Sequence, residues 1–244
     1  MEQFFTSSEQ VQNIIKGFNL TKTLFVSSII IGEPNIGKKS LALYLFPETP
    51  LVSGKNQEEV EKLLQEVDEL IITDFEKLSN QESLNLDNKR IIATANYLGN
   101  QQTIDNLFAF IYTMPPLKKR PEDVAYVRDL FIKEAKSNLM LEDKVFDANK
   151  IQLNLNDNSK TLKQTIYTYL MKHSMDSKDI QEAIYNYILQ NLSGNNKYKE
   201  HLGLYEKPLI EAGLKKYGSQ LQLSQVLGIN RNTLRKKIHE HRID

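Results

Sequence analysis

The chain has 244 residues, of which 40% are hydrophobic and 25% charged, a composition typical of a soluble globular protein of one to three compact units. Lys plus Arg and Asp plus Glu each number 31, so the whole chain has no net charge that would favour a polyanionic partner. The absence of cysteine excludes disulfides, thiolate zinc sites and a cysteine nucleophile. Apolar runs such as residues 29–31 are far shorter than the roughly 18 residues of a membrane span, and the N-terminus lacks a secretory signal pattern. We therefore expect a cytoplasmic protein with no membrane partner.

The charges are unevenly distributed along the chain. Residues 201–244 hold eight Lys or Arg against four Asp or Glu, so this segment carries a charge of +4 and residues 1–200 carry −4. Three of the four histidines also lie in this last segment. A small basic end on a mildly acidic body indicates a regulatory body with a nucleic-acid-binding tail.

Strand-like and helix-like segments alternate through the first half of the chain. The β-branched apolar run at residues 23–31 stops at Gly32, and a helical pattern opens after Gly37. Further strand-like runs are residues 51–53, 70–74, 90–95 and 108–113. Between them, Val60, Leu63, Leu64 and Val67 recur at the spacing of an amphipathic helix. This alternation predicts an α/β fold with a parallel sheet covered by helices on both faces.

Helical spacing dominates after Pro115-Pro116. Apolar stripes predict helices around residues 124–131, 165–171 and 180–192, and the polar, Asn-rich segment 151–157 predicts a loop. Residues 193–197, which are Ser, Gly, Asn, Asn and Lys, form the clearest linker.

The last 40 residues predict a helix-turn-helix. Pro208 is expected in a first helical turn, followed by an apolar stripe that ends at Gly218. A short helix at 221–227 stops at Gly228, and a second helix begins with Asn230 as its N-cap.

The second of these helices has two chemically distinct faces. Leu234 and Ile238 are four residues apart and are expected to pack inward. Arg231, Asn232 and Arg235 would project from the opposite side, where they could bond base edges or phosphates.

A phosphate-loop spacing, G-x-x-x-x-G-K, follows the first predicted strand. It consists of Gly32, Glu33, Pro34, Asn35, Ile36, Gly37 and Lys38, followed by Lys39. In such a loop the glycines let backbone N–H groups approach phosphates, and the lysine reaches the β- and γ-phosphates. The alternative interpretation is a well-packed turn in which Lys38 is only a surface charge.

Residues 218–244, with Leu-Gly-Ile-Asn-Arg-Asn-Thr-Leu-Arg-Lys-Lys-Ile at 227–238, closely resemble the Fis-type helix-turn-helix of NtrC-type activators and of the nucleoid protein Fis. The resemblance implies a double-stranded DNA partner, and dimerisation through residues 180–192 and 205–217. It implies base contacts from Asn230, Arg231 and Arg235 and phosphate contacts from Thr233, Lys236 and Lys237. The family usually has two alanines where this chain has Leu223 and Ser224, which leaves the packing of the first helix open.

The first half is similar, in order, to the AAA+ domain of NtrC-type ATPases. That family also lacks a hydroxyl after the loop lysine, where it has glutamate. Residues 70–74 resemble its Mg²⁺-binding strand, residues 90–96 its sensor strand, and residues 115–123 its Pro-Pro-Leu-Arg-Glu-Arg segment. The resemblance implies ATP or ADP with Mg²⁺ as ligand, bound by residues 32–39, Asp74 and Asn96, with Asp74 on the metal.

Several features of the ATPase family are missing. Phe75 stands where the catalytic glutamate should follow Asp74, and Glu76, one residue late, should point to the other face of an extended strand. No Lys or Arg occurs from Ile91 to Leu117, so the arginine fingers are absent, a loss that costs on the order of 10³–10⁵ in rate. Lys160 aligns loosely with the sensor arginine. The Gly-Ala-Phe-Thr-Gly-Ala loop that engages sigma-54 is also absent. We assign no catalytic residue and do not expect efficient hydrolysis.

The sequence therefore predicts a sequence-specific DNA-binding regulator that is cytoplasmic, nucleoid-associated and unable to activate sigma-54 directly. The expected domains are a degenerate AAA+-like domain at 1–125, a helical subdomain at 126–193 and a Fis-type DNA-binding domain at 198–244. One alternative is an ATP-hydrolysing remodeller of a transcription complex. Another is a regulator anchored to DNA that binds a second regulator or an RNA polymerase component.

Overall fold

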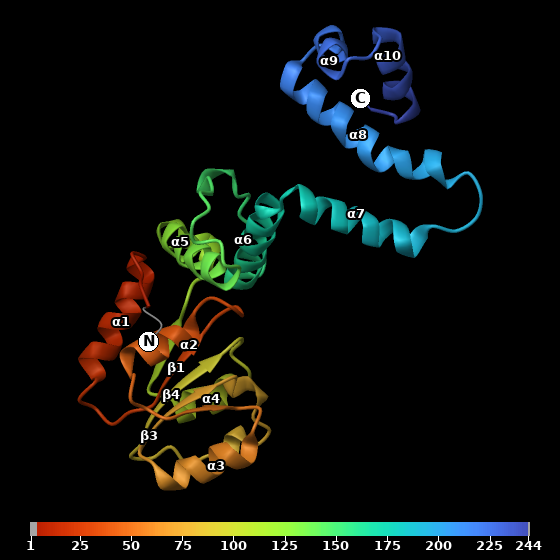
Figure 1. Cartoon of the computed structure of the whole chain (residues 1–244). Coiled ribbons are helices and arrows are strands. Elements are labelled where there is room, and N and C mark those ends of the chain that lie inside the picture. The colour runs from red at the N-terminus through yellow and green to blue at the C-terminus, as the bar shows by residue number, and fades with distance from the viewer. Residues whose placement is uncertain (1–3, 244) are drawn as a thin grey trace. The chain divides into compact units, whose positions relative to one another are not determined.

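A computed structural model describes residues 4–243 and divides the chain into two compact units, one ending at Ser174 and the other beginning at Met175 (Figure 1). Each unit has its own hydrophobic core. None of the helices in the described range is both long enough and apolar enough to span a membrane.

The first unit is built on a five-stranded parallel sheet with the strand order β2-β3-β4-β1-β5. The strands are β1 (Ser28–Ile31), β2 (Leu51–Ser53), β3 (Glu69–Thr73), β4 (Arg90–Ala95) and β5 (Phe110–Thr113). The predicted α/β fold with a parallel sheet is confirmed. The first strand is shorter than the apolar run at 23–31, because the N–H of Leu24 closes a turn onto Thr21 and the Leu24 and Phe25 side chains are half-exposed.

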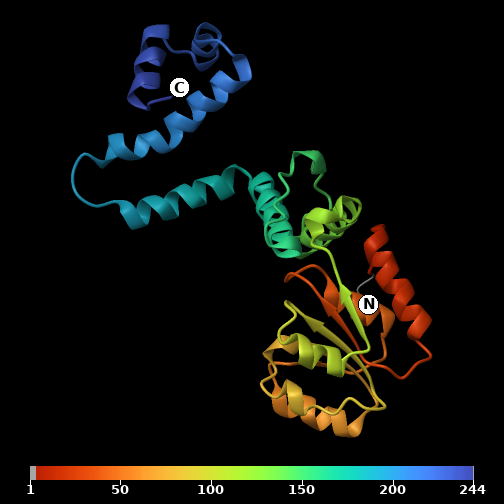
Figure 2. The same cartoon turned by 180° about the vertical axis from the view of Figure 1, so that it is seen from behind.

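Helices cover both faces of the sheet (Figures 1 and 2). Helices α1 (Glu9–Thr21) and α2 (Lys38–Leu45) pack on the face that presents Ile30, Ile71 and Ile92. Helices α3 (Gln57–Glu66) and α4 (Gln101–Leu107) pack on the opposite face, which presents the strand residues before and after each of these isoleucines. Alternate side chains of one strand thus enter different cores, which explains why the strands read as continuous apolar runs.

The rest of the first unit is a helical pair, α5 (Pro121–Asn138) and α6 (Asn158–Ser174), around the buried Leu162, Ile166 and Leu170. The predicted loop at 151–157 contains no helix or strand. Short 3-10 turns lie at Phe75–Lys77, Gln81–Ser83, Leu117–Lys119 and Ala148–Lys150.

The second unit contains α7 (Ser177–Asn191), α8 (Lys197–Tyr217), α9 (Gln220–Leu227) and α10 (Arg231–Glu240). The placement of Pro208 in a first helical turn is wrong, because Pro208 lies in the middle of α8, which begins eleven residues earlier. Its ring removes one internal N–H and crowds the carbonyl of Leu204, and burial of the side of α8 around Ile210 offsets this cost. The domain boundaries at 125, 193 and 198 stay a prediction.

Candidate functional site

The α9–α10 pair has the capped ends of a helix-turn-helix. The Ser219 side chain caps α9 by accepting from the N–H of Gln222, and Gly228 ends it in the left-handed conformation at φ 66°. The Asn230 side chain caps α10 by accepting from the N–H of Asn232 at 2.8 Å, as the sequence predicted for an N-cap. Asn230 therefore already has a structural role in the absence of DNA.

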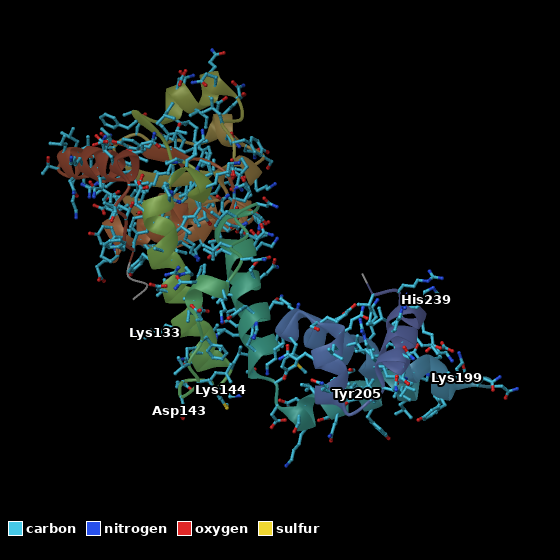
Figure 3. All side chains as sticks on the ribbon, turned by 90° about the horizontal axis from the view of Figure 1, so that it is seen from above. Lys133, Asp143, Lys144, Lys199, Tyr205 and His239 are labelled. Carbon is cyan, nitrogen blue, oxygen red and sulfur yellow. The ribbon has the colours of Figure 1, made fainter. Side chains whose placement is uncertain are left out.

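The two faces of α10 separate as predicted. Leu234 is fully buried and Ile238 packs partly against the same core. The polar side chains that are exposed on this helix are those of Arg231, Asn232, Thr233, Arg235, Lys236, His239 and, at its last residue, Glu240. His239, labelled in Figure 3, also lies on α10. The helix thus presents a continuous set of amide, hydroxyl and cationic groups, which can bond base edges and phosphates.

A glycine on α8 makes room for the first helix of the motif. Leu223 and Ser224, which replace the two alanines of the family, are both buried. A Cβ at Gly213 would lie 2.3 Å from Cδ1 of Leu223, so the larger side chain occupies space left by the missing one. The packing that the sequence left open is therefore compensated by close approach of α8 and α9.

Lys237 differs from the other cations of α10. Its ammonium donates to the carboxylate of Glu206 on α8, and Nε2 of His241 lies 3.1 Å from the second oxygen of that carboxylate. Donation from Lys237, and then from His241, lowers the pKa of Glu206. The phosphate contact predicted for Lys237 thus requires this ion pair to open or to be shared.

The phosphate loop lies between β1 and α2. A Cβ at Gly32 would lie 2.5 Å from the carbonyl oxygen of Met114, and Gly37 has φ 97°, so both glycines are sterically required. Lys38 is buried, and its Nζ donates to the carbonyls of Gly32 and Glu33 at 2.7 Å each and to Oδ1 of Asn96 at 3.0 Å. The interpretation of Lys38 as a mere surface charge is wrong. Burial lowers the pKa of Lys38 to about 8. The negative charges of Glu76 and then of Asp74 act in the opposite direction and raise it.

Glu76 does not point away from this loop, which corrects the expectation based on an extended strand. Strand β3 ends at Thr73, Asp74 is left-handed at φ 52°, and a 3-10 turn begins at Phe75. The turn directs Phe75 into the core and brings Glu76 back toward the phosphate loop. There, Oε1 of Glu76 accepts a hydrogen bond from the side-chain amide of Asn96 at 2.6 Å. The other oxygen, Oε2, is a buried atom for which no hydrogen bond is formed within residues 4–243.

Two adjoining cavities surround the loop. A polar cavity of about 560 Å³ is lined by residues 34–40 together with Leu51, Ser53, Thr73, Asp74, Thr94, Asn96 and Ser159. A more apolar pocket of about 230 Å³ shares Asn35, Ile36, Gly37, Ser40 and Ser159 with it. Its remaining lining residues are Phe4, Phe5, Leu117, Arg120, Asp123, Tyr126, Val127, Leu130 and Phe131. A ligand with a charged end and an apolar end would match the linings of this pair of cavities, and the sequence analysis did not predict the second one.

The apolar pocket rests on a buried ion pair. Arg120 donates to the carbonyl of Ile36 at 2.7 Å and to Asp123 at 3.2 Å. Asp123 in turn accepts from the hydroxyl of Thr6 and the N–H of Ser7, both at 2.7 Å. The pair thereby joins the N-terminal segment, the phosphate loop and α5. Both residues of this ion pair lie in the Pro-Pro-Leu segment. The sequence did not predict their burial, because a charge pair three residues apart usually lies on the surface.

The start of α6 is bonded directly to the phosphate loop. The N–H and hydroxyl of Ser159 both donate to the carbonyl of Asn35, at 3.1 and 2.7 Å. The Asn158 amide donates to the Pro34 carbonyl at 3.0 Å and to Glu33 at 3.1 Å. Lys160 pairs with Asp157 at 3.2 Å, and its alignment with a sensor arginine stays a prediction.

The residues around Asp74 do not fit Mg²⁺ well. Oδ2 of Asp74 lies 3.5 Å from Nζ of Lys55 and 3.3 Å from Oγ of Ser53. Lys39 lines the cavity at the position where most phosphate loops place a metal-binding hydroxyl. Magnesium prefers carboxylate, hydroxyl and water oxygens, and an ammonium supplies none. Within residues 4–243 no group of three His, Cys, Asp or Glu side chains could hold a metal ion.

Comparison with known proteins identifies the C-terminal segment. Residues 202–241 match the family described as bacterial regulatory protein, Fis family. No curated protein matches the chain.

Among solved structures, NtrX from Brucella abortus in complex with ATP is similar with a TM-score of 0.57 and 13% identity, over 99% of this chain and 70% of that one. The same protein in complex with ADP has a TM-score of 0.56 at 13% identity, with the same coverage. A third NtrX structure has a TM-score of 0.53 at 12% identity, over 98% of this chain and 69% of that one. At such identities the likeness establishes the fold. The chain thus combines an α/β fold similar to that of NtrX with a C-terminal helix-turn-helix segment that matches the Fis family of bacterial regulatory proteins.

Proposed function

We propose that the protein is a sequence-specific DNA-binding transcriptional regulator whose α/β domain binds ATP or ADP as a ligand. The observation that carries the proposal is the exposed polar face of α10, with Arg231 and Arg235 on a capped recognition helix inside a Fis-family segment. Arg231, Arg235 and Asn230 would contact bases, and Thr233, Lys236 and Lys237 phosphates. Such a protein would act at the nucleoid.

The active form would be a dimer. Within the described residues, α7 buries no side chain, and Ile180, Tyr187 and Leu189 are about half-exposed or more. Tyr205 on α8 is 63% exposed and, like the solvent-exposed Lys199 near the start of that helix, is labelled in Figure 3. A partner subunit covering α7 and α8 would place two recognition helices in successive major grooves, about 34 Å apart.

Nucleotide binding is supported by the two adjoining cavities. The phosphates would lie on the loop around Lys38, next to Asn96, and the base in the apolar pocket beside Phe4 and Tyr126. NtrX, which has the same fold, has been crystallised with ATP and with ADP.

The test of DNA recognition is selection of bound sites from fragmented genomic DNA, with and without ATP, using Arg231→Ala as the control. We expect enrichment of a two-fold symmetric motif that the control loses, because Arg231→Ala should weaken specific binding by roughly 1–3 kcal/mol. Equal loss of specific and non-specific affinity would contradict the assignment of Arg231 to base contacts.

A second candidate is an ATP-hydrolysing remodeller, and the position of Glu76 favours it. The carboxylate of Glu76 is bonded to Asn96, which is bonded to Lys38, so an acid lies beside the phosphate loop after all. Steady-state phosphate release tests this candidate, with Lys38→Ala and Glu76→Gln as controls. Turnover that both substitutions abolish would favour the remodeller over the ligand-binding regulator.

A further inference from the structure

Two lysines lie at the polar cavity beside the phosphate loop: Lys39 lines the cavity, and Lys55 pairs with Asp74, which also lines it. We propose that this site takes the free nucleotide, with Lys39 and Lys55 neutralising its phosphates in place of Mg²⁺. The inference rests on the nucleotide binding proposed above and specifies the form of the ligand.

The first step concerns Asp74, the carboxylate that would hold the metal. One of its oxygens already faces the Lys55 ammonium at 3.5 Å and the Ser53 hydroxyl at 3.3 Å. The backbone at Asp74 is left-handed, and its carbonyl accepts from the N–H of Lys77 at 2.8 Å. A metal ion on this oxygen of Asp74 would compete with the Lys55 ammonium.

The second step concerns how Lys55 reaches Asp74. The N–H of Gly54 donates to the Thr73 carbonyl at 2.6 Å, and a Cβ at Gly54 would lie only 2.5 Å from the carbonyl oxygen of Asp74. The turn between β2 and α3 therefore packs against the end of β3 with no space for a side chain. Lys55 is the next residue, so the close approach at Gly54 sets the position of the Lys55 backbone. Its side chain remains 68% exposed and can move toward a ligand.

The third step concerns charge. An ordinary phosphate loop meets the nucleotide with one lysine and one divalent ion, a total charge of +3. Here Lys38, Lys39 and Lys55 supply the same total without a metal. Lys39 lines the cavity, and Lys55 lies against the Asp74 carboxylate that lines it. Two ammonium groups at short range repel a divalent cation and attract a polyphosphate.

The experiment measures the affinity of the full chain for ATP and for ADP by calorimetry, once in excess EDTA and once in excess MgCl₂. We expect the wild type to bind in EDTA at least as tightly as in MgCl₂. Lys55→Met should weaken binding in EDTA by about tenfold, since it removes one charge-assisted contact. Lys62→Met is the matched control, because Lys62 is an equally exposed lysine on α3 that pairs with Glu66. Melting temperatures verify that each variant is folded.

A gain of metal dependence provides the second arm. Lys39→Thr restores the hydroxyl of the usual loop, and combined with Lys55→Met it frees Asp74, so the double variant should bind more tightly with MgCl₂ than with EDTA. Wild-type binding that requires MgCl₂ would overturn this inference and leave the proposed function intact. An unchanged affinity of Lys55→Met in EDTA would overturn it as well. No binding in either arm, with Lys38→Ala indistinguishable from wild type, would overturn the proposed nucleotide binding itself.

Discussion

Lys38 holds the position of a phosphate-binding lysine but is engaged with its own loop. Its ammonium contacts two carbonyls and Asn96, and only 7% of the residue is exposed. A nucleotide must therefore exchange these contacts for phosphate oxygens. The sequence predicted the residue from spacing alone, but it could not show that the loop bonds to its own lysine together with Asn96, because Asn96 is far away in the chain.

The titration of Lys38 predicts how nucleotide affinity depends on pH. Burial lowers its pKa from 10.5 to about 8, and the protonated form binds phosphate. Affinity should therefore fall as the pH rises through 8, and binding near pH 8 should take up protons because phosphates favour the cation. Calorimetry in two buffers of different ionisation enthalpy measures that uptake. Lys38→Ala provides the control, and equal uptake in this variant would assign the proton to another group.

The Glu206 carboxylate gives a second prediction at this scale, for DNA binding. Since Lys237 and His241 both bond to it, Glu206→Gln should release Lys237 and remove a negative charge near the DNA-binding face. Non-specific affinity should rise by a few-fold, with a steeper salt dependence. Fluorescence anisotropy with a random duplex at several salt concentrations tests this, with Glu211→Gln on the same helix as the control. If Glu206→Gln changes neither the affinity nor the salt dependence, the ion pair with Glu206 does not restrict the contact of Lys237 with DNA.

The same carboxylate also links stability to pH. The pKa of Glu206 is lower in the folded protein than its ordinary value of 4.5. Its contribution to the free energy of unfolding is therefore fully present above that ordinary value and is lost as the pH falls through the folded pKa. Urea unfolding of the wild type and Glu206→Gln at neutral and acidic pH should give curves that converge on acidification. A difference that persists at acidic pH would indicate a role other than charge.

At the scale of secondary-structure elements, local signals predicted what depends on local chemistry. Helix α10 begins after the predicted cap Asn230, and the predicted runs at 51–53 and 90–95 are strands β2 and β4. The errors occurred where tertiary packing decides. Pro208 is tolerated inside α8 because Ile210 and its neighbours bury that helix, and Glu76 turns back because Phe75 is drawn into the core.

The close contact between Gly213 on α8 and Leu223 on α9 predicts that the effect of Gly213→Ala on stability reverses when Leu223 is replaced by alanine. In the wild type, Gly213→Ala should destabilise the second unit by about 1 kcal/mol or more, since overpacking against Leu223 outweighs the gain in helix propensity. With Leu223→Ala already present, the same substitution should stabilise by up to about 1 kcal/mol. Urea unfolding of the wild type, the two single variants and the double variant measures both effects. Stabilisation in both backgrounds would mean that α8 and α9 separate easily.

At the scale of the whole molecule, the division after Ser174 predicts separate responses to the two ligands. Differential scanning calorimetry should show two transitions, because each unit has its own core. ATP should raise the temperature of one transition and a specific duplex that of the other, since a ligand stabilises the unit that binds it. Calorimetry of the isolated segment 175–244 identifies which of the two transitions belongs to the unit that binds DNA. A single transition raised by either ligand would show that the units unfold together.

Phe75 is fully buried and packs edge-on against Phe108 at 5.1 Å between ring centroids. A protein engineer who wished to rebuild an ATPase motor would place glutamate at this position, directly after Asp74. That single exchange would remove an aromatic ring from the core, at about 3–5 kcal/mol, and insert a carboxylate among hydrocarbon. Such an exchange would require repacking the α4 side of the sheet before any catalytic benefit appeared. The buried ring of Phe75 therefore makes glutamate at this position costly for the stability of the first unit.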